Sequence, residues 1–196
     1  MAEIKSTMDL VMEKLARMDL RDAPDLDEEE LQREGMRAAA EFLRGEKEDL
    51  TAALNAVEPG RQRFLKSGMI RALVRNIVLP RNDEQKAEAR RAMAGILAIA
   101  GGSGDIEAML QDVTNILERY GEHRKQMRDQ LEQAFAQQMR QMEDNLAMQT
   151  GVSMKLEPSQ HPKFKEEWQR LSGDLDDQYG RAVEQYKDEI RRRLAG

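Results

Sequence analysis

The stretch DIEAMLQDVTNILERYGEHRKQMRDQLEQAFAQQMRQMEDNLAMQTG, residues 105–151, predicts the dominant element of the fold. It contains no proline, and Gly121 is its only glycine before Gly151. A helix of about 44 residues, roughly 65 Å long, is expected here. Its apolar side chains recur mostly at steps of three or four, which places them on one helical face; they are Ile106, Met109 or Leu110, Val113, Leu117, Tyr120, Met127, Leu131, Phe135, Met139, Met142 and Leu146.

A second long helix is predicted from Pro162 to Leu194, because proline is favoured in a first helical turn. Between the two helices, Thr150-Gly151 predicts a turn, and residues 152–156 alternate in polarity as a short extended strip would. Two helices joined by a short connection pack antiparallel, so residues 105–196 should form a helical hairpin, or coiled coil. The returning helix is predicted to be about a quarter shorter than the outgoing one, so N-terminal helices or a second subunit must cover the rest of the outgoing helix. The apolar face of the returning helix carries Phe164, Trp168, Leu171, Leu175, Tyr179, Val183, Tyr186, Ile190 and Leu194.

Residues 1–100 predict an N-terminal bundle of about four helices. The expected helices cover residues 4–20, 25–57, 61–79 and 83–100, with Asp25 or Asp27 capping the second and Gly45 as its candidate break. Pro80 should end the third helix, and Asn82 or Asp83 should cap the fourth. The run Gly101-Gly-Ser-Gly104 then separates the bundle from the hairpin. The fold class is therefore expected to be all-α.

Composition excludes several classes of protein. Of the 196 residues, 35% are charged and 4% are aromatic, which is typical of long helices and unlike a β-sandwich or barrel. The formal net charge of -6 argues against general nucleic-acid binding. No cysteine is present, so thiolate metal sites and disulfides are excluded. The longest apolar run, Ala92 to Ala100, is far shorter than the roughly 20 residues that span a bilayer, and a cytoplasmic protein is expected.

The residues available for catalysis are few. Only His123 and His161 titrate near neutral pH. Di-iron helical bundles require a glutamate three residues before each such histidine, and neither histidine has one. His161 is interpreted as part of a helix start. The glycine run before Asp105 lacks the Gly-Lys-Ser/Thr of a phosphate-binding loop. We therefore expect no catalytic residue, no cofactor and no metal site, and we predict that the protein is not an enzyme.

Charge is distributed unevenly between two neighbouring stretches. Residues 22–50 hold eleven acids and four bases, whereas residues 61–81 hold six bases and no acid. The favoured interpretation is that the basic helix packs against the acidic one. The alternative is an exposed basic, amphipathic surface that contacts a membrane or a nucleic acid. The basic residues are Arg61, Arg63, Lys66, Arg71, Arg75 and Arg81.

Four stretches carry a resemblance to a family of uncharacterised helical bacterial proteins. They are MAEIKSTMDLVMEK (1–14), LPRNDEQ (79–85), QAFAQQMRQMEDNLAMQTGVSMKLEPSQHPKFKEEW (133–168) and DQYGRAVEQYKDEIRR (177–192). In that family a glutamine-rich helix leads into a QTG turn, matched here by Gln149-Thr-Gly151. The resemblance implies a bacterial cytoplasmic setting and no known activity.

The hypothesis that follows is a non-enzymatic interaction or scaffold protein that acts through its helical hairpin with a protein partner of unknown identity. Each hairpin helix buries only one face against the other, so Phe135, Met139, Met142 and Trp168 are expected to be shared with a second copy in a homodimer. Two alternatives stay open. One is a peripheral membrane- or nucleic-acid-associated factor using residues 61–81, and the other is a holdase-like chaperone that grips clients through methionines.

Overall fold

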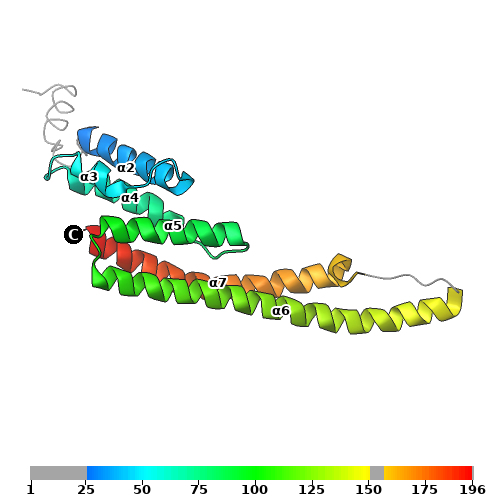
Figure 1. The fold of residues 1–196 in the computed structure, drawn as a ribbon. Helices are drawn as coiled ribbons and strands as arrows, with labels where there is room; N and C mark the ends of the chain where they lie inside the picture. The colour runs from blue at the N-terminus through cyan, green and yellow to red at the C-terminus, as the bar shows by residue number, and fades with distance from the viewer. Residues whose placement is uncertain (1–25, 151–156, 196) are drawn as a thin grey trace, which may run out of the picture.

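The computed structural model describes residues 26–150 and 157–195, and most of this part of the chain is helical (Figure 1). It contains six α-helices, one short 3-10 helix and no strand, which confirms the all-α prediction. The predicted helix over 4–20, the cap at Asp25 and the strip over 152–156 lie outside the described residues. The elements are α2 (Leu26–Arg44), α3 (Leu50–Asn55), α4 (Gln62–Arg75), α5 (Asp83–Ile99), α6 (Gly104–Thr150), η1 (Pro158–Gln160) and α7 (Pro162–Ala195).

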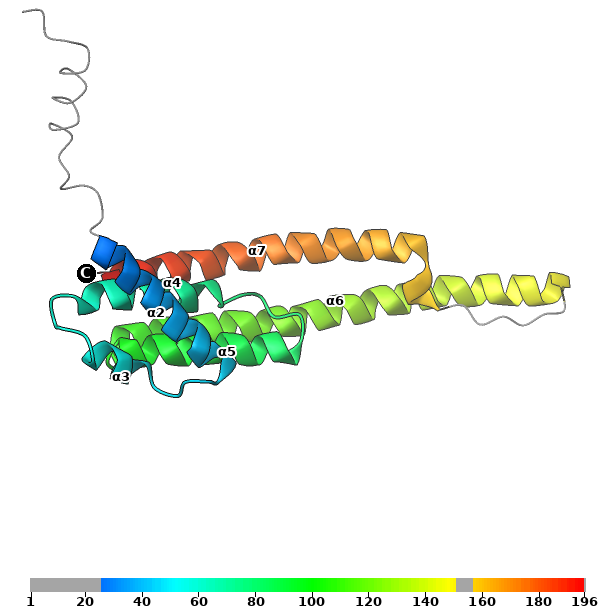
Figure 2. The same ribbon diagram turned by 90° about the horizontal axis from the view of Figure 1, so that it is seen from above.

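The two longest helices, α6 and α7, lie side by side and run antiparallel (Figure 1, Figure 2). Contacts between them pair early residues of one helix with late residues of the other, from Arg193–Asp105 at one end to Phe164–Phe135 towards the other. Helix α6 has 47 residues and α7 has 34. Because Arg193 is level with Asp105, the extra length of α6 lies entirely at the end where the chain turns back.

The N-terminal helices cover only one half of this hairpin. Helix α5 packs on α6, where Arg90 contacts Glu118 at 3.0 Å, and α4 packs on α7. Beyond them α6 and α7 continue as a pair, and α6 finally runs on past α7 (Figure 2). We call residues 129–150 and 157–171 the arm. The hairpin is therefore neither free-standing nor fully covered by the bundle.

Helices α2 and α4 cross in direct backbone contact. A Cβ atom placed on Gly68 would overlap the carbonyl oxygen of Gln32, and one placed on Gly35 would overlap that of Leu65. Glycine inside a helix costs about 1 kcal/mol relative to alanine, so both positions are explained by this close approach. The acidic helix and the basic helix thus do pack together, as the favoured interpretation of the charge pattern predicted.

Helix boundaries follow the local chemistry with one difference. Gly45, with a φ of 81°, separates α2 from α3, and Asn82 caps α5 by accepting from the Gln85 amide at 2.8 Å. Helix α4 ends at Arg75, four residues earlier than predicted. Pro80 disfavours helical conformation in Leu79, and residues 77–80, which lead to the hairpin, belong to no helix.

One apolar core joins helices from both sides of the glycine run 101–104. Leu65, Met69 and Leu73 of α4 belong to the same buried cluster as Val113 of α6 and Ile190 of α7. Ile77, in the non-helical segment after α4, is also fully buried in it. The division into residues 1–100 and 105–196 stays a prediction, while the described core is shared across it.

Candidate functional site

The predicted basic surface of residues 61–81 is divided among different surroundings. Arg61 forms an ion pair with Asp27 at 2.9 Å, and Arg63 lies 4.0 Å from Glu28, so this end binds the acidic first turn of α2. Arg81, at the other end, contacts α7 instead. The six cations therefore do not form one continuous surface.

Two of these cations remain on the surface in the C-terminal half of α4. Arg71 and Arg75 are exposed and lie one turn apart, and Lys66 is half-buried. Among the described residues, none of the three forms an ion pair. The exposed part of the predicted basic surface is thus reduced mainly to Arg71 and Arg75.

The apolar residues predicted to be shared with a second copy also separate. The ring of Phe135 packs edge-on against Phe164 at 5.5 Å and lies 5.7 Å from the His161 ring, and Met139 is buried. These two side chains belong to the interior of the hairpin. Met142, in contrast, is 58% exposed on the part of α6 that α7 does not reach.

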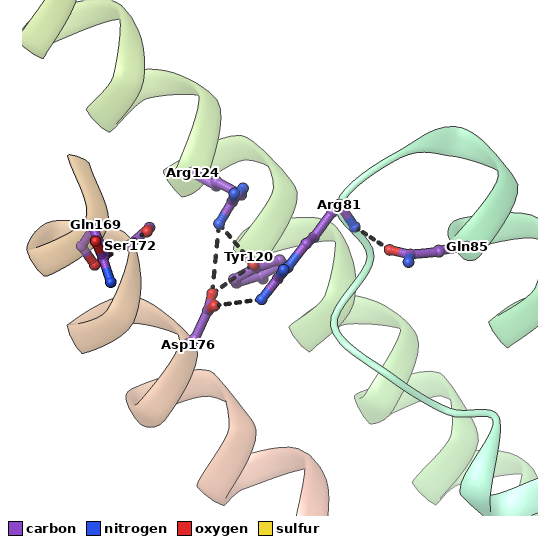
Figure 3. A network of polar contacts seen from close by, with 7 residues as sticks. All are labelled: Arg81, Gln85, Tyr120, Arg124, Gln169, Ser172 and Asp176. Atoms are coloured by element: carbon purple, nitrogen blue, oxygen red, sulfur yellow. Dashed lines mark hydrogen bonds and ion pairs between the residues drawn. The ribbon is translucent and has the colours of Figure 1, made fainter. Parts of the chain in front are cut away.

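A polar junction holds the segment after α4 against the hairpin (Figure 3). Asp176 of α7 is its centre. The Tyr120 hydroxyl donates to Asp176 Oδ1 at 2.7 Å, while Arg81 and Arg124 approach the two carboxylate oxygens at 3.3 and 3.6 Å. Arg124 also donates to the Tyr120 hydroxyl at 3.2 Å. Three segments distant in sequence therefore meet at one carboxylate.

The Tyr120 side chain is fully buried at this junction. Burial, followed by the hydrogen bond to Asp176, raises the pKa of the Tyr120 phenol above its ordinary value near 10.0. The ring also packs edge-on against Tyr179, whose hydroxyl lies 3.0 Å from Nδ1 of the exposed His123. A neutral, hydrogen-bonded phenol in this position is a structural contact, and its raised pKa removes it further from use as a base.

Beside the junction lies an open groove of about 710 Å³, which we call the base groove because it lies at the base of the arm. Trp168 of α7 lies at its arm side, with the guanidinium carbons of Arg124 and Arg128 at 5.0 and 5.8 Å from the ring centroid. Two residues that the sequence singled out separately, Arg81 and Trp168, thus line the same groove. The lining residues are Pro80, Arg81, Asn82, Asp83, Lys86, Glu118, Gly121, Glu122, Arg124, Lys125, Arg128 and Trp168.

The base groove offers charged and aromatic groups for binding. Its lining has no serine, histidine or threonine beside a base. Within residues 26–150 and 157–195, no three acidic or histidine side chains gather as a metal site requires. In the same ranges no helix is long and apolar enough to cross a membrane.

The sequence did not predict that Tyr120, Arg124 and Asp176 form one polar junction. Tyr120 was predicted only as one apolar position of the long helix, and Asp176 was not singled out. The register between the two long helices is what brings these residues together, and the contacts Asp105–Arg193 and Asp112–Tyr186 define that register. Once the two helices are aligned antiparallel with these ends level, position 120 lies opposite positions near 176.

Comparison with known proteins places the chain in a family. No curated protein and no solved structure matches it. The family model described as "Family of unknown function (DUF6657)" matches residues 51–192. The match begins in α3 and ends near the C-terminus of α7, so it includes the base groove, the junction and the whole arm. Because it covers well over half of the 196 residues, the chain belongs to the DUF6657 family of unknown function.

Proposed function

We propose that this protein is a non-enzymatic interaction protein whose arm is the element that a partner contacts. The observation that carries the proposal is that the arm projects beyond every N-terminal helix of the described chain (Figure 1). A pair of helices buries one face of each and leaves the outer faces to solvent. Met142 is 58% exposed and Met148 is 85% exposed on the last turns of α6.

Methionines in such a position suit binding of another protein. Their unbranched thioether side chains adapt to irregular apolar surfaces. The partner class that we favour first is a second copy of this chain, because two arms side by side would cover each other's outer faces. Light scattering at tens of micromolar tests this directly: a dimer mass supports self-association, and a monomer mass rejects it.

A comparative capture experiment tests the arm itself. Proteins retained from native lysate are compared between the wild type and a Met142→Glu/Met148→Glu variant. The matched control is Ala94→Glu/Ala98→Glu, which adds the same two charges at exposed positions of α5. Partners lost by the arm variant and kept by the control support the proposal. Identical captured sets from all three proteins refute it.

A second candidate is a peripheral factor that binds anionic membranes or RNA through α4. It is favoured by the exposure of Arg71 and Arg75, which have no ion-pair partner within residues 26–150 and 157–195, and by the 42% exposure of Val78. Binding of liposomes and of RNA by Arg71→Glu/Arg75→Glu beside the wild type tests this candidate. Loss of binding with unchanged helicity supports it, and equal binding removes it. Suppression of client aggregation that depends on Met142 and Met148 would instead indicate a holdase.

A further inference from the structure

The base groove is more basic than the chain that contains it. Five cations and three carboxylates line it, a balance of two positive charges in a protein of formal charge -6. Most of this charge is paired within the chain. Lys86 approaches Glu118, Arg81 and Arg124 both approach Asp176, and Arg128 approaches Glu132. Lys125 is exposed and has no ion-pair partner in the described chain. Lys125 is therefore the lining cation most available to an anion, and Arg128 can exchange its exposed contact with Glu132 for one with a ligand, because exposed ion pairs contribute little to stability.

Two guanidinium groups in the groove are held in place by an aromatic ring. Arg124 and Arg128 lie one turn apart on α6, and both stack on Trp168. Stacking against an indole restrains a guanidinium and leaves its N–H edges available. Arg128 uses its Nε on Glu132, and Arg124 uses Nη1 on Tyr120, so each keeps further N–H donors from its five. Pre-positioned donors of this kind match the two oxygens of a carboxylate.

The floor of the base groove also allows a bound chain to approach the α6 backbone closely. Gly121 lies within α6 and lines the groove, and no atom lies within 4 Å of the place where its Cβ would be. The crowding that explains Gly35 and Gly68 is therefore missing here. A glycine at this position exposes the α6 backbone beside the three cations, and an incoming chain can pack directly against it.

We propose that the base groove binds an acidic peptide segment of a partner protein, with carboxylates on Arg124, Lys125 and Arg128 and the chain running over Gly121. This inference rests on the proposed function as an interaction protein and names the chemistry of the partner. A peptide can space its carboxylates to avoid Asp83 and Glu122, whereas a nucleic acid brings a phosphate at every step. The indole face that a base would stack on is also occupied by the two arginines.

Tryptophan fluorescence reports on the base groove, because Trp168 is the only tryptophan of the chain. The full-length protein is titrated with a blocked Glu-Glu-Leu-Glu-Glu peptide while Trp168 fluorescence is followed, and polarisation of a labelled peptide gives a second readout. The Gln-Gln-Leu-Gln-Gln peptide is the neutral control. We expect saturable binding of the acidic peptide alone. Lys125→Gln/Arg128→Gln should weaken it by about tenfold or more, because charge-assisted contacts are lost.

A matched variant distinguishes the loss of contacts in the base groove from a general effect of removing positive charge. Arg71→Gln/Arg75→Gln removes the same two charges on α4, outside the groove, and should bind the peptide as the wild type does. Absence of saturable binding, equal weakening by both double variants, or tighter binding of inorganic phosphate or a single-stranded oligonucleotide than of the peptide would each overturn the proposal.

The lysate capture distinguishes this inference from the proposed function. If Met142→Glu/Met148→Glu loses partners and Lys125→Gln/Arg128→Gln keeps all of them, the arm is confirmed as the binding element and the groove proposal falls. If the groove binds the acidic peptide and the arm variant loses no partner, the groove stands and the role of the arm falls.

Discussion

Replacing Gly68 by alanine should destabilise the protein, although alanine is the better helix former. The new Cβ would overlap the Gln32 carbonyl oxygen and lie 2.8 Å from its carbonyl carbon, where ordinary contacts begin at 3.4 Å. Both atoms belong to backbone, so they cannot rotate away. Helices α2 and α4 must separate by at least the 0.6 Å between these distances. A gap of that size forfeits a quarter or more of the dispersion energy of the atoms facing it.

The magnitude follows from two opposing effects. Overpacking against a rigid neighbour costs up to about 3 kcal/mol. Alanine regains about 1 kcal/mol of helix propensity. The net loss in the free energy of unfolding should be about 2 kcal/mol, which lowers Tm by about 4–8 °C in a chain of this size. Gly35→Ala should act alike, because its Cβ overlaps Leu65 from the other side of the crossing.

Gly173→Ala is the matched control for this substitution. Gly173 also lies inside a long helix, but no atom lies within 4 Å of the place of its Cβ. The propensity gain is then unopposed, and Tm should rise by about 2–4 °C. Circular dichroism at 222 nm during heating and in urea measures all three variants. A Tm for Gly68→Ala at or above that of the wild type would refute the close crossing.

Further predictions concern the α5 cap, the junction and its titration. Asn82→Ala should lower the unfolding free energy by about 1 kcal/mol, because the Gln85 amide loses its acceptor, whereas Asn82→Asp should leave it nearly unchanged in the same thermal melts. Tyr120→Phe should cost about 1 kcal/mol at neutral pH, measured in urea, because Asp176 loses a 2.7 Å hydrogen bond. Folding raises the pKa of the Tyr120 phenol. The stabilisation from its hydrogen bond to Asp176 is therefore complete below pH 10 and is lost as the pH rises through the folded-state pKa. The advantage of wild type over Tyr120→Phe should therefore shrink in strongly alkaline buffer, and a constant difference from neutral to alkaline pH would contradict this assignment.

Much of the helical layout was predictable from local patterns. Three- and four-residue spacing of apolar side chains identified both long helices, and Pro162, Gly45 and Asn82 marked boundaries that the structure confirms. These features depend on neighbours within a few residues, where propensity and capping decide the outcome. The α4 end was predicted too late. Pro80 restricts only Leu79, whereas the earlier end accompanies the complete burial of Ile77 in the shared core, which local patterns do not report.

The candidate site was predictable only in fragments. Arg81 and Trp168 were both singled out, but nothing in their sequence positions indicated a common groove. Phe135 and Met139 were assigned to an interface between copies, and the structure places them inside the hairpin. An apolar periodicity reports that a helical face is covered, but it does not say by which neighbour.

The sequence by itself determined that this protein is a set of amphipathic helices ending in two long ones, because helix formation and capping are local properties. Only the tertiary structure decided which helices touch, through the backbone contact at Gly35 and Gly68, and how far the bundle covers the hairpin. It also decided that Tyr120, Arg81 and Asp176 meet. Those contacts depend on the register between elements far apart in the chain, and register is set by the packing of whole faces.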